Sequence, residues 1–286
     1  MQLIFRLPKR QHVSSHPWRE PIKHLLLLLF DDEYRQYYIL FKRYGKYSKY
    51  TGKRVKFNSF VFDVPDVESF IAQYRDIMLY KEYRFKTRSN NPVIIDLGAN
   101  VGLSVFYFIT EYPNAVIEAY EADPEIYEYL SSNIHMNIRN SKGIKLINRA
   151  AWDKDGVICF IPDGADGGYV SDHFSNCDKH AKEVNVIDAK KILEKYDHID
   201  MLKIDIEGAE YVVIKRVQEY LSRVNNIFIE YHSSRNDDQK LADILQILKE
   251  KGFRVYIKSY MDQLEPLISR FNAGEFDMCI NIYAYR

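Results

Sequence analysis

Glycines and an acidic residue stand together where a short apolar run of the sequence ends. The run Val93–Leu97 contains Asp96 and leads into Gly98, Asn100 and Gly102. Glycines let a ligand approach the backbone closely, and the first N–H groups of a following helix attract an anion. The dinucleotide fingerprint G-x-G-x-x-G is absent, and Asp96 would repel a pyrophosphate. The loop therefore suits a ligand that carries both an ammonium, directed toward Asp96, and a carboxylate, as S-adenosylmethionine does.

A second acid follows the next apolar run. Glu121 comes directly after residues 116–120, 23 residues beyond Gly98, near the spacing at which an acid reaches ribose hydroxyls in nucleotide-binding folds. Asp123 and Pro124 match the cap and the first position of a helix. A plain surface position is the alternative for Glu121, but two acids at successive strand ends favour a nucleotide-like cofactor.

Four carboxylates and an imidazole lie at the ends of two later apolar runs: Asp205, Glu207, Glu210, Glu230 and His232. In a parallel sheet these strand ends meet at the same edge as the glycine loop. Such acids are compatible with one another when the site receives a cation, hydroxyl groups or a divalent metal. We expect Glu207 and Glu210 to contact substrate and Asp205 to lie near the cofactor as well. An acid at the start of a helix is the alternative for Glu210.

Strands and helices alternate from about residue 60 onward. Apolar runs predict strands at 93–97, 116–120, 145–148, 201–204, 226–230, 254–258 and 277–285. Helices are expected near 103–112, from 124, near 210–221 and near 239–251. Continuous apolar strands separated by helices imply a parallel sheet that is covered on both faces. The predicted fold class is α/β, doubly wound. Lys203, inside one of these strands, is expected to be a buried partner of a carboxylate.

Residues 1–58 differ in character from residues 59–286. Apolar residues recur at steps of three and four between Ile22 and Tyr44, which predicts one or two amphipathic helices. We expect a helical appendage, with a homodimer through these helices as the rival interpretation. Residues 42–56 hold seven cations, no acid and three tyrosines. This composition suits a phosphate-bearing partner, although a solvated surface is the plain alternative.

Composition excludes several classes of protein. The 40 Lys and Arg balance the 40 Asp and Glu, which argues against a general polyanion-coating protein. Apolar residues make up 47%, enough for a full core. Cys159, Cys177 and Cys279 fit neither a disulfide framework nor a zinc site, which favours a reducing, cytoplasmic location. The longest apolar run, 25–30, is far below the roughly 18–20 residues that span a bilayer, so we expect no transmembrane segment.

Several of these segments together resemble the FkbM family of S-adenosylmethionine-dependent methyltransferases. The resemblance rests on 95–104 (IDLGANVGLS), 121–124 (EADP), 202–210 (LKIDIEGAE), 229–232 (IEYH) and 281–285 (NIYAY). It runs from about residue 60 to the end. It implies that residues 59–286 form a class I, Rossmann-like, mostly parallel seven-stranded sheet, behind an N-terminal helical and basic appendage at 1–58.

The resemblance also implies an enzyme that methylates oxygen. By this analogy Gly98, Asn100 and Gly102 hold the amino-acid end of S-adenosylmethionine, Glu121 holds its ribose, and the backbone at Ala151 flanks its adenine. We expect the acceptor to be a sugar hydroxyl of a glycan or of a nucleotide- or lipid-linked saccharide precursor. This interpretation suggests polysaccharide biosynthesis in the cytoplasm, peripheral to a membrane-associated glycan-assembly system.

Methyl transfer to a hydroxyl needs a group that accepts the proton. His232 suits this role, because an unperturbed imidazole has a pKa near 6.5. Asp205 or Glu230 would serve instead or would orient His232. The same three residues would hold a divalent cation such as Mg²⁺ if the reaction uses one. Tyr169, in the glycine-rich stretch 163–169, is expected to contact substrate from a loop that covers the acceptor.

Two other functions stay open on the sequence alone. A nucleic-acid methyltransferase would use the basic residues 42–56. Against it, residues 205–208 read Asp-Ile-Glu-Gly rather than the Asp/Asn-Pro-Pro-aromatic element of adenine methylation. A non-catalytic module that binds the cofactor or a partner is the third interpretation.

Overall fold

The computed structural model describes residues 19–47, 50–139, 141–162, 168–171, 182–235, 237–259, 265, 267–268 and 276–286. The chain divides into two units, Met1–Glu82 and Tyr83–Arg286. A boundary after residue 58 would fall in the turn of a β-hairpin, because strands Lys53–Phe57 (β1) and Phe60–Val64 (β2) pair antiparallel with Phe57 opposite Phe60. The division after Glu82 keeps the hairpin whole.

The first unit packs helices against this hairpin through aromatic side chains. Its helices are Arg19–Phe30 (α1), Asp32–Tyr44 (α2) and Val67–Tyr74 (α3), followed by a π-helical turn at Arg75–Leu79. Asp31 and Asp66 cap α2 and α3, because each carboxylate accepts a hydrogen bond from a backbone N–H of the first turn. The ring of Phe62 lies 5.6 Å from Phe57 and 5.5 Å from Phe70. The helices agree with the sequence pattern, whereas the hairpin was not predicted.

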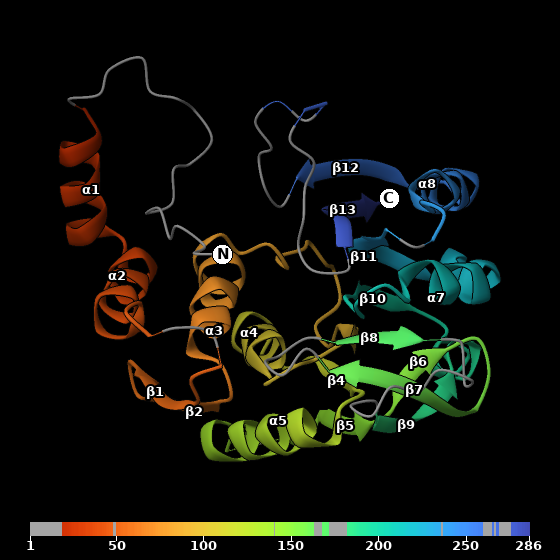
Figure 1. Ribbon diagram of the computed structural model, residues 1–286, viewed down its shortest axis with the longest axis horizontal. Helices are drawn as coiled ribbons and strands as arrows, with labels where there is room; N and C mark the ends of the chain where they lie inside the picture. The colour runs from red at the N-terminus through yellow and green to blue at the C-terminus, as the bar shows by residue number, and fades with distance from the viewer. Residues whose placement is uncertain are drawn as a thin grey trace. The chain divides into compact units, whose positions relative to one another are not determined.

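A seven-stranded sheet forms the centre of the second unit (Figure 1). Its strands are Val93–Leu97 (β3), Val116–Glu121 (β4), Ile144–Asn148 (β5), Ile199–Ile204 (β10), Val224–Ser234 (β11), Arg254–Ser259 (β12) and Phe276–Tyr285 (β13). Their order is β12-β13-β11-β10-β3-β4-β5. Only β13 runs antiparallel to its two neighbours, and the other pairs are parallel. The mostly parallel seven-stranded sheet is therefore confirmed.

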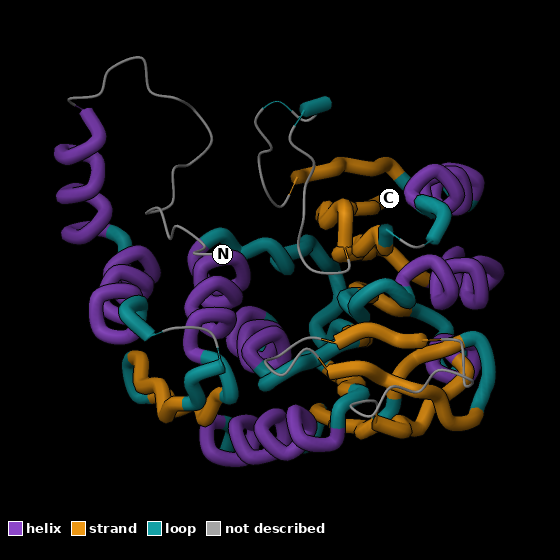
Figure 2. The backbone as a smooth tube through the Cα atoms, viewed as in Figure 1, coloured by secondary structure: helices purple, strands orange, loops and turns teal. Residues whose placement is uncertain are grey.

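Both faces of this sheet are covered by helices (Figure 2). Ile227 and Ile229 of β11 belong to one core with side chains of Ala189–Leu193 (α6), Glu210–Val217 (α7) and Leu241–Glu250 (α8). Phe228 points to the opposite face, where its ring lies 4.8 Å from that of Tyr83. Tyr83 in turn stacks on Phe108 of Leu103–Glu111 (α4), at 5.8 Å. Alternate strand residues thus pack into two layers, as a doubly wound sheet requires. The helix Pro124–Asn137 (α5) begins at the predicted cap, Asp123.

A second sheet of four strands was not predicted. It contains Ala150–Trp152 (β6), Gly156–Pro162 (β7), Gly168–Ser171 (β8) and Lys182–Asp188 (β9), in the order β6-β9-β7-β8. Cys159 in β7 is disulfide-bonded, whereas Cys279 is free. This corrects the expectation that the cysteines form no disulfide, and with it the argument for a reducing location. Among the described residues, no helix is long and apolar enough to cross a bilayer.

Strand order reverses between β3 and β10, which are neighbours in the sheet. Ligands of open α/β sheets bind in the crevice outside the carboxyl ends of the strands at such a switch point. The loop after β3 must pass very close to the loop after β10. A Cβ atom on Gly98, whose φ is +84°, would lie 1.8 Å from the carbonyl oxygen of Asp205. Glycine at position 98 is therefore required by backbone packing, and the two loops form one site.

Candidate active site

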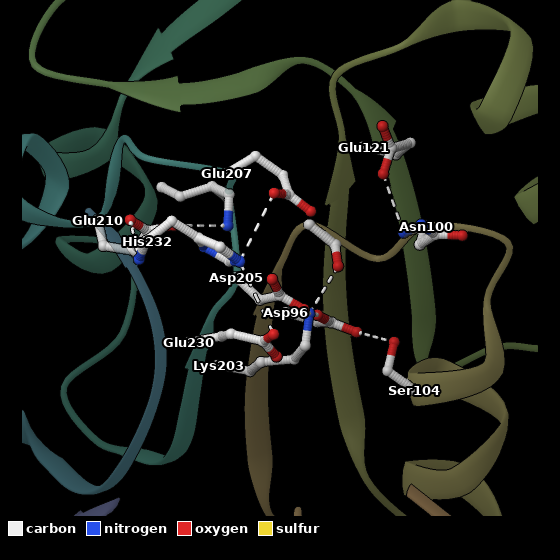
Figure 3. Close-up of polar contacts among 12 residues, drawn as sticks. Asp96, Asn100, Ser104, Glu121, Lys203, Asp205, Glu207, Glu210, Glu230 and His232 are labelled. Atoms are coloured by element: carbon white, nitrogen blue, oxygen red, sulfur yellow. Dashed lines mark hydrogen bonds and ion pairs between the residues drawn. The ribbon is translucent and has the colours of Figure 1, made fainter. Parts of the chain in front are cut away.

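A buried lysine stands at the centre of the switch point. Lys203 of β10 is 2% exposed, and its Nζ lies 3.1 Å from Oδ1 of Asp96 and 3.5 Å from Oδ2 of Asp205 (Figure 3). The same Nζ donates a hydrogen bond of 2.6 Å to the carbonyl oxygen of Gly98. Burial acts to lower the pKa of Lys203, but the charges of Asp96 and Asp205 outweigh it and raise that pKa. The ammonium stays charged and ties the ends of β3 and β10 together.

The position of Asp96 corrects one expectation. Asp96 is fully buried, and its Oδ2 accepts a hydrogen bond of 2.6 Å from the hydroxyl of Ser104 at the start of α4. Its other oxygen faces Lys203. A buried carboxylate needs such partners to offset its lost hydration. The ammonium that Asp96 contacts therefore belongs to the protein, not to a ligand, and the role of Asp96 is to position Lys203 and the glycine loop.

Glu121 has the properties expected of a ligand-binding acid. Its two carboxylate oxygens accept hydrogen bonds of 2.9 Å from the backbone N–H groups of Asn100 and Asp123. The side chain is nearly buried, and among the described residues no cation forms an ion pair with it. Burial raises the pKa of Glu121 to about 7, although both backbone hydrogen bonds act to lower it. Each carboxylate oxygen can accept a second hydrogen bond, so hydroxyl donors of a ligand would stabilise the charged form.

His232 is surrounded by carboxylates on the other side of Lys203 (Figure 3). Its Nδ1 lies 3.2 Å from Glu210, and its Nε2 lies 3.6 Å from Glu207 and 3.7 Å from Glu230. Burial acts to lower the pKa of His232, but the three carboxylates outweigh it and raise that pKa well above 6.5. The imidazole is therefore in its positively charged, doubly protonated form at neutral pH. The sequence argument, which assumed an unperturbed imidazole, did not foresee this.

Glu230 shares this environment and also holds protons tightly. Burial and the charge of Asp205 raise the pKa of Glu230 well above its ordinary value, although His232 and Lys203 act in the opposite direction. Perturbed groups that face one another in a crevice are typical of catalytic sites. The geometry thus brings together the three residues, Asp205, Glu230 and His232, that were expected to carry catalysis.

Glu210 has a structural position rather than the substrate contact expected of it. It is completely buried, and one of its oxygens accepts hydrogen bonds from the backbone N–H groups of Ile206 (3.2 Å) and Gly208 (3.0 Å). These bonds hold the turn in which Glu207 has a φ of +54° and Gly208 a φ of +99°. Glu207, in contrast, is 33% exposed. The turn therefore exposes Glu207 to the crevice, while the buried Glu210 orients His232 through its contact with Nδ1.

A divalent cation stays a prediction, with one change in its ligands. Asp205, Glu207 and His232 each offer one ligand atom, and these atoms lie within 4.8 Å of one another. Ligands at about 2.1 Å from Mg²⁺ are at most roughly 4.2 Å apart, so the side chains would have to close by several tenths of an ångström. Glu207 takes the place that Glu230 was expected to have in this set.

The other residues predicted to contact the cofactor or substrate lie in the glycine loop and in the small sheet. Gly102 has a φ of +93° and caps α4, and Asn100 has a φ of +49° in the same loop. Ala151 lies buried in β6. Tyr169 belongs to β8, where it pairs with Ile161, but its side chain lies outside the described residues, as do residues 163–167 of the expected loop. Lys203 was expected only as a buried carboxylate partner, which is confirmed; a charged residue inside an apolar strand was the signal for it.

Replacement of Lys203 by methionine tests how far the site depends on this ammonium. The variant leaves Asp96 and Asp205 without their shared cation, so we expect a loss of roughly 3–5 kcal/mol in the free energy of unfolding, measured in urea. The matched control is Lys191→Met, because Lys191 is 54% exposed and pairs with Asp155, which is 47% exposed. A surface pair of this kind contributes at most about 1 kcal/mol. Equal losses in the two variants would contradict the central role of Lys203.

Comparison with known proteins agrees with this geometry. The family model "Methyltransferase FkbM domain" matches residues 96–255. The methyltransferase sdnD of Sordaria araneosa is 26% identical over 216 residues, which cover 64% of this chain and 81% of the relative. The 2-O-methyltransferase NoeI of Sinorhizobium fredii is 25% identical over 170 residues, 54% of this chain and 66% of the relative.

A third relative is the 31-O-demethyl-FK506 methyltransferase FkbM of Streptomyces tacrolimicus, 23% identical over 195 residues, 57% of this chain and 73% of the relative. The matched segment begins at Asp96 and includes the glycine loop, Glu121, Lys203 and the carboxylates around His232. Because the family model covers more than half of the residues, we conclude that the chain belongs to the FkbM family of S-adenosylmethionine-dependent methyltransferases and is a methyltransferase.

Proposed function

We propose that this methyltransferase transfers a methyl group from S-adenosylmethionine to a sugar hydroxyl of a glycan or of a nucleotide- or lipid-linked saccharide precursor. One observation carries the proposal: carboxylates that can accept hydrogen bonds from hydroxyl groups lie on both sides of the switch point. Glu121 is the last residue of β4, Asp205 and Glu207 follow β10, and Glu230 lies within β11. The names of two relatives, a 2-O-methyltransferase and a 31-O-demethyl-FK506 methyltransferase, support oxygen as the methylated atom.

The loop after β3 and Glu121 fit the donor. Glu121 would accept hydrogen bonds from the ribose hydroxyls, since its carboxylate is held by two backbone N–H groups and has acceptor capacity left. Gly98, Asn100 and Gly102 would lie against the amino-acid part. When bound, S-adenosylmethionine supplies a methyl group on a positively charged sulfur. The carboxylate-rich rim favours that positive charge.

The acceptor side is supported by the partly exposed carboxylates. Asp205, Glu207 and Glu230 are between one fifth and one third exposed, so they can accept hydrogen bonds from several hydroxyl groups at once. We propose that these bonds orient one hydroxyl, because alignment of the reacting atoms accounts for much of the acceleration of such displacements. The proton of that hydroxyl passes to the deprotonated form of His232 or of Glu230. The raised pKa values make each group a stronger base once it is deprotonated, but leave less of that form at neutral pH.

Donor affinity is expected to depend on the charge of Glu121. The carboxyl group has a pKa of about 7, so the affinity for S-adenosylmethionine, measured by calorimetry, should fall as the pH decreases below about 7. Glu121→Gln should bind roughly tenfold more weakly at pH 8 and lose this pH dependence. Glu125→Gln, in the exposed first turn of α5, is the matched control. Unchanged affinity of Glu121→Gln across the pH range would remove Glu121 from the proposed donor site.

His232 is expected to act in turnover rather than in donor binding. Because the pKa of His232 lies well above 6.5, most of the wild-type enzyme has a protonated His232 at neutral pH, which cannot act as a base. The rate should therefore rise as the pH increases through and above neutrality. His232→Ala should lose most turnover and this slope while it binds the donor normally. His198→Ala, an exposed histidine, is the control. Full activity of His232→Ala across the pH range would exclude His232 from the mechanism.

The acceptor class is tested by comparing glycans from cells with and without the gene. We expect mass spectrometry to show saccharides that lack the mass of one methyl group when the gene is deleted. Restoration by the wild-type gene, but not by the His232→Ala variant, would connect the loss to this site. Unchanged glycans together with a lost methyl group on a nucleic acid or a small natural product would contradict a sugar acceptor and leave the methyltransferase assignment intact.

A further inference from the structure

The first unit presents apolar side chains on one face of α1. Leu25, Leu26, Leu29 and Phe30 are 56%, 49%, 59% and 81% exposed. At 3.6 residues per turn these four positions span roughly 140° of the helix circumference. The half-buried residues His24, Leu27 and Leu28 occupy the other side of α1. The Nδ1 of His24 lies 2.8 Å from the hydroxyl of Tyr34 in α2. The helix therefore packs on α2 through one side and leaves a continuous apolar face on the opposite side.

Cations for which the described residues offer no acidic partner lie next along the chain. Lys42 and Arg43 are exposed at the end of α2, one turn after the exposed Ile39, and Lys46 follows. Within the described residues of this unit they contact aromatic rings: Lys42 lies 5.4 Å from the ring of Tyr38, and Lys46 lies 5.5 Å from that of Tyr47. Tyr38 also contacts His24 of α1, at 5.1 Å between ring centres. This connects the cationic end of α2 to α1.

The three acids at the start of α2 are already engaged within the unit. Asp31 caps α2 by accepting from Tyr34, Asp32 pairs with Arg35, and Glu33 accepts from the hydroxyl of Tyr74 at 3.1 Å. Within the part of this unit that the structure describes, Lys42, Arg43 and Lys46 are not neutralised in this way. The exposed surface of α1 and α2 thus combines large apolar side chains, tyrosines and unneutralised positive charge, which is the composition of proteins at the boundary between lipid headgroups and acyl chains.

We propose that this surface, formed by Leu25, Leu26, Leu29, Phe30, Ile39, Lys42, Arg43 and Lys46, binds the surface of an anionic lipid bilayer. The apolar residues enter the headgroup region, and the cations contact lipid phosphates. Electrostatic repulsion disfavours a dimer through this surface, because a symmetric contact would bring the same cations of two copies together. A nucleic acid would engage the cations but leave the four apolar side chains of α1 in water.

The test uses the full chain and vesicles of equal parts phosphatidylglycerol and phosphatidylcholine, with phosphatidylcholine alone as the neutral comparison. We expect sedimentation with the anionic vesicles only, and a bound fraction that falls as salt is added. Leu25→Glu combined with Leu29→Glu, and Lys42→Glu combined with Arg43→Glu and Lys46→Glu, should each lower the partition coefficient at least about tenfold. Circular dichroism confirms that each variant is folded.

Two matched controls distinguish binding through this surface from a general effect of losing exposed apolar side chains or positive charge. Leu267→Glu changes a residue of the second unit that is 96% exposed, and Lys154→Glu with Lys215→Glu and Lys249→Glu gives the same net charge change on exposed positions there. Both controls should bind vesicles like the wild type. Three outcomes would overturn the proposal: sedimentation that no variant alters, a dimer in light scattering that the leucine variant dissociates without any vesicle binding, or RNA binding that only the cation variant loses without any vesicle binding.

Discussion

The ammonium of Lys203 inside an apolar sheet is the constraint on which the site depends. A buried cation persists only where carboxylates and carbonyl groups surround it, and here they come from three places: Asp96 within β3, the carbonyl of Gly98 in the loop after it, and Asp205 after β10. These partners belong to the two strands at which the strand order reverses. The same contacts that satisfy Lys203 therefore fix the relative position of the two loops that form the crevice.

The chemistry of the crevice depends on which carboxylates are bound by other groups of the protein and which stay partly exposed. Asp96 is occupied by Lys203 and Ser104, and Glu210 by two backbone N–H groups and His232. Asp205, Glu207 and Glu230 stay partly exposed. The internal acids thus act as supports, and the exposed ones give the crevice a negative potential suited to a cationic methyl donor and to hydroxyl groups. His232 is protonated because of this arrangement, so its neighbours define its role as much as its own chemistry does.

Much of this could be predicted from sequence because it depends on local pattern. Apolar runs located the seven central strands, Asp123 and Pro124 located the start of α5, and strand ends identified the residues that meet at one edge. The errors concern tertiary partners. The motif around Asp96 does not reveal that an internal lysine takes its carboxylate. The small sheet was missed although β9 alternates buried Val184 and Val186 with more exposed neighbours, because the charged residues at both ends of β9 obscure that pattern.

The proposed lipid surface and the proposed acceptor rest on different residues but have a physical consequence in common. Binding to a bilayer confines an enzyme to a thin layer, where a lipid-linked acceptor has a much higher effective concentration than in the surrounding solution. Weak hydrogen bonds to each acceptor hydroxyl are then sufficient for methyl transfer, because the high local concentration of the acceptor replaces tight binding. Partly exposed carboxylates such as Glu207, which bind hydroxyl groups weakly in water, are better suited to an acceptor delivered in this way than to a dilute soluble sugar.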